Sequence, residues 1–61
     1  MTAAQCKELA SYYKVQSQAA SISPSRASIL KNIAKSFLGL ATQLDRLAAL
    51  VRDEAKSKQS R

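Results

Sequence analysis

Large apolar residues recur at alternating steps of three and four along the second half of the chain. The row is Leu30, Ile33, Phe37, Leu40, Leu44, Leu47 and Val51. Such spacing places side chains on one face of an α-helix. The pattern predicts a single long amphipathic helix over residues 24–56, with Pro24 as its first residue.

A row of alanines runs beside the large residues at intervals of seven. Its members are Ala27, Ala34, Ala41, Ala48 and Ala55. A two-stranded coiled coil usually carries charged residues in the position that alanine takes here. The apolar face is therefore wider than one coiled-coil seam, and the small side chains on its flank allow a further helix to approach closely. This width favours a helical bundle over an isolated helix pair.

The first half of the chain predicts a shorter helix over residues 3–21. Thr2 and Gln5 have the spacing of a capping box, in which each side chain accepts a hydrogen bond from the other residue's backbone N–H. Ser23 as N-cap and Pro24 as first helical residue mark the start of the second helix. Because a short connection usually joins antiparallel neighbours, the fold class is all-α, an antiparallel helical hairpin.

The two predicted helices are unequal, at roughly 28 Å and roughly 50 Å. A hairpin closed at the turn then leaves the end of the longer helix uncovered from about residue 43, with Leu44, Leu47, Leu50 and Val51 exposed. The 61 residues form one domain over 1–56, and the last segment, 57–61, is predicted to be a disordered basic tail because it contains no apolar residue.

A chain of this size buries only about 60% of its unfolded surface, so a single hairpin is marginally stable. One cysteine and no histidine leave no intrachain disulfide and no zinc site to stabilise it. We therefore expect self-association, with a homodimeric four-helix bundle favoured and another helical protein as the alternative partner. The predicted interface residues share the apolar face: Leu30, Ile33, Ala34, Phe37, Leu40, Ala41, Leu44, Leu47, Ala48 and Val51.

The formal charge of +6 is large for this length and favours anionic partners, although it also keeps a small protein in solution. Lys31 and Lys35 are four residues apart with no acid in the adjacent turns. The candidate anion-binding residues are Lys31, Lys35, Arg46, Arg52, Lys56 and Lys58. They raise the hypothesis of sequence-independent contact with nucleic-acid phosphates, but a solvated helix face is the favoured interpretation. No helix-turn-helix signature or aromatic stacking platform accompanies them.

Candidate chemistry is sparse. The four carboxylates lie on polar helix faces, and no phosphate-binding glycine loop or metal-ligand spacing is present, so we expect no catalytic, metal or cofactor site. Cys6 lies on an apolar face, which predicts a buried thiol, with an intermolecular disulfide as the alternative. Gly39 is interpreted as a tolerated helical glycine, with a bend or a close contact with a partner as the alternatives.

The expected location is the cytoplasm, since the lone cysteine fits a reducing compartment and the N-terminus lacks a secretion signal. The apolar stretches are too short to span a bilayer. Binding of the basic amphipathic helix to a membrane surface is a third functional hypothesis, disfavoured because the apolar face has no tryptophan.

Two stretches resemble a group of short uncharacterised helical-hairpin proteins of alphaproteobacteria. One is Cys-x-x-Leu-Ala-x-x-Tyr, present here from Cys6 to Tyr13, and the other is Ile-Ala-x-Ser-aromatic-x-x-Leu-Ala, present from Ile33 to Ala41. The chain departs from the second pattern in the spacing of the preceding arginine and in having Phe37 where tryptophan is common. The resemblance implies a bacterial source and a helical hairpin, and it carries no activity.

Overall fold

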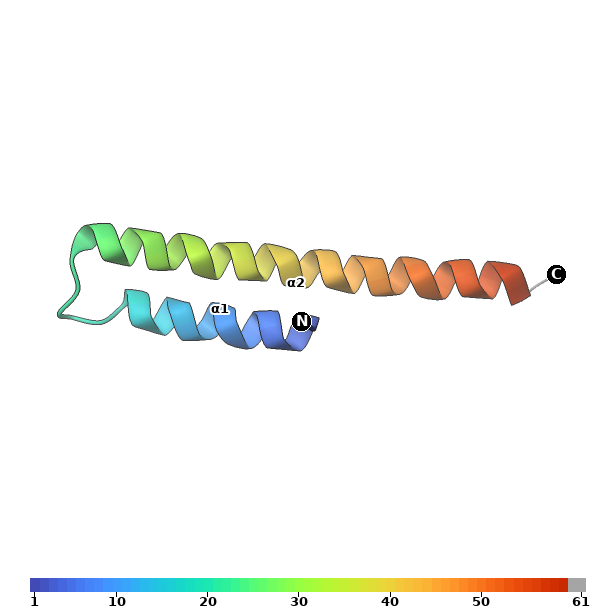
Figure 1. Ribbon diagram of the computed structural model, residues 1–61, viewed down its shortest axis with the longest axis horizontal. Coiled ribbons are helices and arrows are strands. Elements are labelled where there is room, and N and C mark those ends of the chain that lie inside the picture. The colour runs from blue at the N-terminus through green and yellow to red at the C-terminus, as the bar shows by residue number, and fades with distance from the viewer. Residues whose placement is uncertain (60–61) are drawn as a thin grey trace.

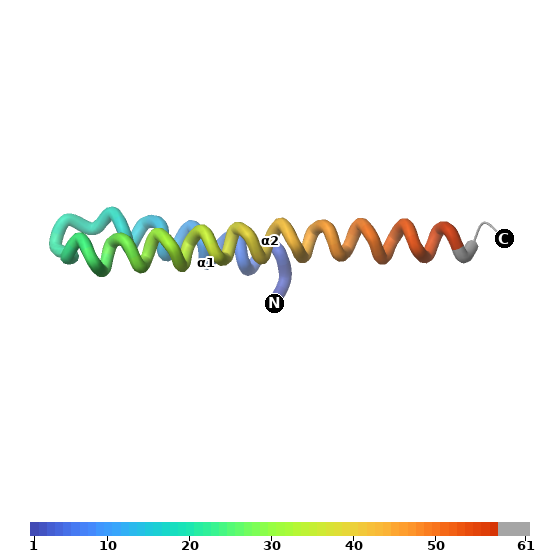
Figure 2. The backbone as a smooth tube through the Cα atoms, turned by 90° about the horizontal axis from the view of Figure 1, so that it is seen from above, coloured from blue at the N-terminus to red at the C-terminus, as the bar shows by residue number. Residues whose placement is uncertain are grey.

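The computed structural model describes the backbone of residues 1–59 and the side chains of residues 1–57. Two helices, α1 (Ala3–Ser17) and α2 (Pro24–Gln59), run antiparallel and pack against each other (Figure 1). The predicted all-α hairpin is confirmed. Seen from above, α1 still lies along α2, so the pair forms a layer one helix thick (Figure 2). Assembly into a bundle stays a prediction.

The N-terminus of α1 is capped as the sequence predicted. The Thr2 hydroxyl accepts a hydrogen bond from the Gln5 backbone N–H at 3.1 Å. The Gln5 side-chain oxygen accepts one from the Thr2 backbone N–H at 2.8 Å. This reciprocal pair satisfies two N–H groups that have no partner within the helix, and it fixes where α1 begins.

The expected end of the first helix at residue 21 is wrong, because α1 ends at Ser17. The Ser17 hydroxyl donates to the Lys14 carbonyl, and the Gln18 N–H donates to the Val15 carbonyl at 3.1 Å. These bonds close the last turn three residues back instead of four, which tightens the chain and ends the α-helix. Residues 18–23 then form a longer connection than the sequence suggested.

The beginning of α2 agrees with the sequence, and its end lies further on. Ser23 Oγ accepts a hydrogen bond from the Arg26 N–H at 3.2 Å, and Pro24 is the first helical residue. The helix continues through Gly39 and reaches Gln59, beyond the expected end at residue 56. The last turns contain no glycine or proline to stop it. Of the predicted disordered tail, residues 57–59 are helical, and residues 60–61 lie outside the described residues.

Small side chains fill the contact between the two helices. The buried apolar residues of the described chain are Cys6, Ala10, Ala34 and Ala41, and Ser17 is buried with them. Cys6 is the largest side chain among those that are fully buried. Beside this seam the Tyr13 and Phe37 rings stack, with centroids 5.7 Å apart and planes 4° from parallel. Small buried side chains, one aromatic pair and partly buried aliphatic residues such as Leu30 and Leu44 therefore hold the hairpin together.

The alanine row of α2 faces α1 of the same chain. Ala34 and Ala41 are buried against it, and Ala27 is partly buried. Lys7 near the start of α1 pairs with Asp45, so α1 extends about as far as the latter part of the alanine row. The remainder of α2 projects beyond α1 (Figure 1). We call residues 49–59 the overhang.

Candidate interaction site

The layer has two faces that differ in chemistry. Ala41, at 1% exposed, points at α1. Because successive helical residues are about 100° apart, Leu40 lies about 100° round from Ala41 on one side, and Leu38 about 60° round on the other. The two leucines therefore belong to opposite faces of the hairpin.

The Leu40 face carries a largely exposed stripe, which we call the apolar stripe although it includes Ser36 and Gln43. We define this stripe as Ile29, Ile33, Ser36, Leu40, Gln43, Leu47 and Leu50. Leu40, Leu47 and Leu50 are 44%, 56% and 56% exposed, respectively. A groove of about 320 Å³ lies over the first half of the stripe and is lined by Ile29, Asn32, Ile33, Ser36, Phe37 and Leu40. The stripe contains no charged residue.

The first helix extends this apolar face. Leu9 precedes the buried Ala10 and lies about 100° from it, on the flank opposite Lys7. It is partly buried and lines a shallow hollow with the exposed Met1 and Tyr12. Tyr12 also meets Tyr13 edge to face, with ring centroids 5.2 Å apart. Apolar side chains of both helices thus lie on one side of the layer.

The predicted interface residues divide into three groups by exposure. Ala34 and Ala41 are buried inside the hairpin, so a second copy cannot reach them while the hairpin is closed. Partly buried residues are Leu30, Ile33, Phe37 and Leu44, and exposed ones are Leu40, Leu47, Ala48 and Val51. The sequence-based list omitted Ile29 and Leu50, which complete the stripe. Their spacing relative to Leu40 and Leu47 was the signal that identifies them.

The opposite face carries a lysine groove of about 290 Å³ between the helices. Its lining is Lys14, Ser17, Gln18, Lys31, Ala34, Lys35 and Leu38. The structure thus brings the predicted pair Lys31 and Lys35 together with Lys14, which sequence reasoning missed. Lys14 follows Lys7 by seven residues, so it could have been found once Lys7 was aligned with Asp45 across the hairpin. Lys14 also lies in the last turn of α1, where a cation interacts favourably with the C-terminal carbonyls.

No acidic residue lines the lysine groove. The nearest acid along α2 is Asp45, ten residues or about 15 Å from Lys35. Its Oδ2 lies 3.6 Å from Lys7 Nζ, and both side chains are mostly exposed, at 59% and 61%. An exposed ion pair of this kind contributes little stability, and at physiological salt its field is screened within about 8 Å. The positive potential of the groove is therefore not neutralised by the acids of α2.

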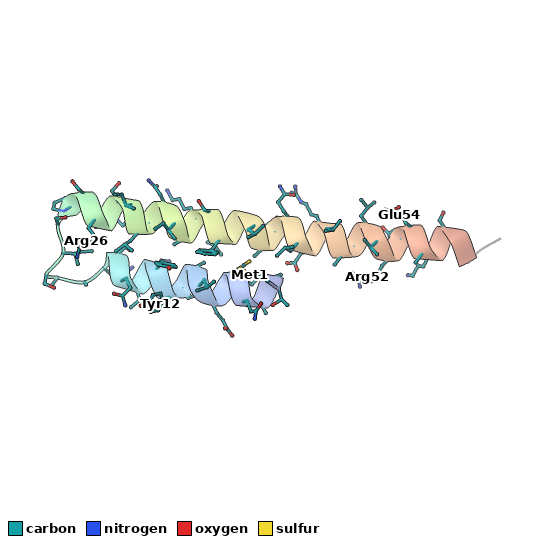
Figure 3. All side chains as sticks on the ribbon, in the orientation of Figure 1. Met1, Tyr12, Arg26, Arg52 and Glu54 are labelled. Carbon is teal, nitrogen blue, oxygen red and sulfur yellow. The ribbon has the colours of Figure 1, made fainter. Side chains whose placement is uncertain are left out.

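The remaining anion-binding candidates do not join this groove. Arg46, Arg52 and Lys56 follow Lys35 by 11 to 21 residues, which places them about 16 to 32 Å away along the helix. Arg52 lies well along α2 from the turn (Figure 3). The Lys58 side chain lies outside the described residues. The basic residues therefore form one compact group at the hairpin and a dispersed set beyond it.

Cys6 is a free cysteine and is 0% exposed, which confirms the predicted buried thiol. An intermolecular disulfide would require the hairpin to open. Within the described residues, no three metal-ligating side chains gather, and neither helix is sufficiently long and apolar to cross a membrane. The structure offers two surfaces, the apolar stripe and the lysine groove.

Comparisons of this chain with protein families, with curated proteins and with solved structures find no match.

Proposed function

We propose that this protein is a small, non-catalytic helical interaction module, of the adaptor or regulator type, that associates with itself through the apolar stripe. The observation that supports it is a mismatch between core and surface. No side chain larger than cysteine is fully buried among the described residues, while most of the large aliphatic side chains of the stripe are exposed. Contiguous exposed apolar surface rimmed by polar residues is typical of an interaction site.

The energetics point the same way. The fully buried apolar side chains, Cys6, Ala10, Ala34 and Ala41, are small, and larger ones such as Leu30 and Phe37 are only partly buried, so the hairpin leaves much apolar area in water that burial would stabilise. Covering the stripe adds the larger side chains that the hairpin leaves out. A second copy of the same chain is the simplest partner, since symmetric dimers are the commonest soluble oligomers.

The test is sedimentation equilibrium of the native chain and of the double variant Leu40→Ala, Leu47→Ala. Each leucine is about half exposed, and association buries that exposed half. Full burial of a leucine side chain contributes about 1.5 to 3 kcal/mol. A dimer contains four of these leucines. The dissociation constant of the double variant should therefore be at least about a hundredfold higher than that of the native chain. A native chain that is fully helical and monomeric at micromolar concentration would refute the proposal.

The chain provides a matched control in Leu38→Ala. Leu38 is 51% exposed, between the values for Leu40 and Leu47, and belongs to the same helix. It lies on the lysine-groove face, so its loss should leave the dimer constant within about threefold. Far-ultraviolet circular dichroism on all variants separates loss of association from loss of helix. Equal weakening by Leu38→Ala would mean that the stripe is not the interface.

A second candidate function is binding of phosphate groups, such as those of nucleic acid, in the lysine groove. The convergence of Lys14, Lys31 and Lys35 without an acid is the observation that favours it. Phosphate contacts made by lysines release counterions, so affinity falls steeply as salt rises. Association through the apolar stripe should instead persist at high salt.

Fluorescence anisotropy with a labelled duplex at low salt tests this second function. We expect Lys14→Gln with Lys35→Gln to weaken binding about tenfold or more and to lower the salt slope by about two. The control is Lys7→Gln, which removes one charge from the same face but from a lysine already paired with Asp45. Absence of binding by the native chain at about 50 µM protein, within the range of non-specific dissociation constants, removes the candidate.

A further inference from the structure

We propose that two copies pair through antiparallel α2 helices centred on Leu40, with Arg26 of each copy facing the partner's Glu54. This arrangement rests on the proposed self-association and specifies its geometry. It follows from a row of residues on α2. When two copies of this row run in opposite directions, apolar members face apolar members and the positive end faces the negative end.

The row has seven-residue spacing and contains Arg26, Ile33, Leu40, Leu47 and Glu54. Its three apolar members belong to the exposed stripe, and the two charged members stand at its ends. In an antiparallel pair centred on Leu40, Arg26 lies opposite Glu54 and Ile33 lies opposite Leu47. A parallel pair instead sets Arg26 against Arg26 and Glu54 against Glu54, and like charges in contact repel. The charges at the ends of the stripe therefore select the antiparallel direction.

The neighbouring row of the stripe has the same property. It contains Ile29, Ser36, Gln43 and Leu50 in that order, with apolar residues outside and polar residues inside. The same reversal sets Ile29 near Leu50 and Ser36 near Gln43. Apolar residues therefore face apolar residues, and polar residues face polar residues, along both rows. Such self-complementarity is what a two-fold interface requires, since residue i contacts j and residue j contacts i.

The shape of the apolar stripe also favours antiparallel pairing. The apolar groove lies over residues 29–40, in the first half of the stripe. Leu47 and Leu50 project from the second half, each 56% exposed. Antiparallel pairing brings these two leucines onto the partner's groove, as side chains of one helix fill the spaces between four residues of a facing helix. Parallel pairing sets groove on groove and leucine on leucine.

The overhang also gains a neighbour in this arrangement. With Leu40 at the centre, residues 49–57 of one copy lie level with residues 23–31 of the other, beside the half of the hairpin that holds the turn. Val51 and Leu50, which α1 of their own chain does not cover, then face the partner. Because a seven-residue row drifts about 20° per heptad, the two α2 helices wind around each other with a left-handed supercoil. Arg26 and Glu54 lie near the two ends of α2 (Figure 3).

Charge reversal tests the pairing. Sedimentation equilibrium is measured for the native chain, for Arg26→Glu, for Glu54→Arg, and for an equimolar mixture of the two variants. Each variant alone faces like charges at both ends of the stripe, and we expect its dimer to be about tenfold weaker. In the mixture, the carboxylate introduced at position 26 faces the guanidinium introduced at position 54 of the other variant. At the opposite end the unchanged Arg26 faces the unchanged Glu54, so a heterodimer of native strength should form.

The control for charge reversal is Arg52→Glu. Arg52 lies off the stripe, so its reversal should change the dimer constant by less than about twofold. The two test reversals act differently on the helix itself. Arg26→Glu places an acid in the first turn of α2, which is the preferred arrangement there, whereas Glu54→Arg lies more than one turn before Gln59 and sets two like charges four residues apart, at positions 54 and 58. Circular dichroism of each variant separates weakened association from loss of helix.

The outcomes separate the two proposals. Tight association of the native chain without rescue in the mixture overturns the antiparallel pairing and leaves self-association standing. A helical native monomer overturns both. A native monomer that gains helix only with vesicles of anionic phospholipid also overturns both, because the stripe would then bind a lipid surface. Rescue of the mixture to native strength, with Arg52→Glu unchanged, supports the arrangement.

Discussion

Replacement of Ala41 by leucine tests whether the hairpin depends on close approach of its helices. Ala41 is 1% exposed, and the residues buried with it are no larger than cysteine. Because the Ala41 side chain is already covered and its fully buried neighbours are small, an added isopropyl group has to displace the facing helix. The helices must then move apart along the seam, and the Tyr13–Phe37 stacking at 5.7 Å is disturbed with them.

The expected loss follows from this geometry. Overpacking of a tight contact decreases the free energy of unfolding by about 1 to 3 kcal/mol. A domain of this size shifts its midpoint by about 4 to 8 °C per kcal/mol, so the melting temperature of Ala41→Leu should fall by about 4 to 24 °C. Leucine and alanine are both strong helix formers, so helix propensity contributes little to this difference.

The assay is thermal unfolding followed by circular dichroism, at several protein concentrations because association raises the apparent midpoint. Ala55→Leu is the control. Ala55 is an exposed alanine of the same helix, and its replacement should change the free energy of unfolding by less than about 0.5 kcal/mol. If Ala41→Leu melts at or above the native temperature, the alanine row is not the seam of the hairpin and the reasoning fails.

Three further predictions follow from particular residues. Gly39→Ala should raise the free energy of unfolding by up to about 1 kcal/mol, measured by urea denaturation, because the added methyl meets no atom within 4 Å; a weaker dimer instead would reveal a partner helix in close contact there. The Cys6 thiol, 0% exposed, should react with a thiol reagent at least about a hundredfold more slowly in the native chain than in urea, and equal rates would contradict its burial. Ser23→Ala should lower the free energy of unfolding by about 0.5 to 2 kcal/mol through loss of the N-cap bond to Arg26, with Ser25→Ala as the exposed control.

The parts of the fold that depend on local chemistry were predictable from sequence. Thr2 with Gln5, and Ser23 with Pro24, determine where helices begin through hydrogen bonds within a few residues, and both caps occur as predicted. The end of α1 was not predictable in this way. Ser17 is compatible with a helix interior as well as with a helix end, and only the tight turn that follows shows that its hydroxyl bonds to the Lys14 carbonyl.

The candidate site depends on which part of the apolar face α1 covers, and local sequence rules do not determine that. Periodicity identified a wide apolar face on residues 24–56 but could not decide which part α1 would cover. The structure places α1 on the alanine row, with Ala34 and Ala41 buried, and leaves Leu40 and Leu47 exposed. Two helices can approach closely over a row of alanines, whereas a row of leucines would hold them apart. The smaller residues are therefore the ones buried within the chain. The lysine groove required the same information, because Lys14 joins Lys31 only when the antiparallel register is known.

The division of the apolar face connects stability with assembly. A hairpin whose fully buried apolar side chains are small, and whose large ones are at most partly buried, has limited hydrophobic stabilisation of its own. A partner that binds only the folded hairpin stabilises it by mass action, in proportion to the logarithm of concentration over the dissociation constant. On the proposed dimer, folding and association are therefore one linked equilibrium. The melting temperature should rise with protein concentration for the native chain and for Leu38→Ala. It should become independent of concentration for Leu40→Ala with Leu47→Ala. That double variant retains the alanine seam but loses the surface through which a second copy stabilises the hairpin.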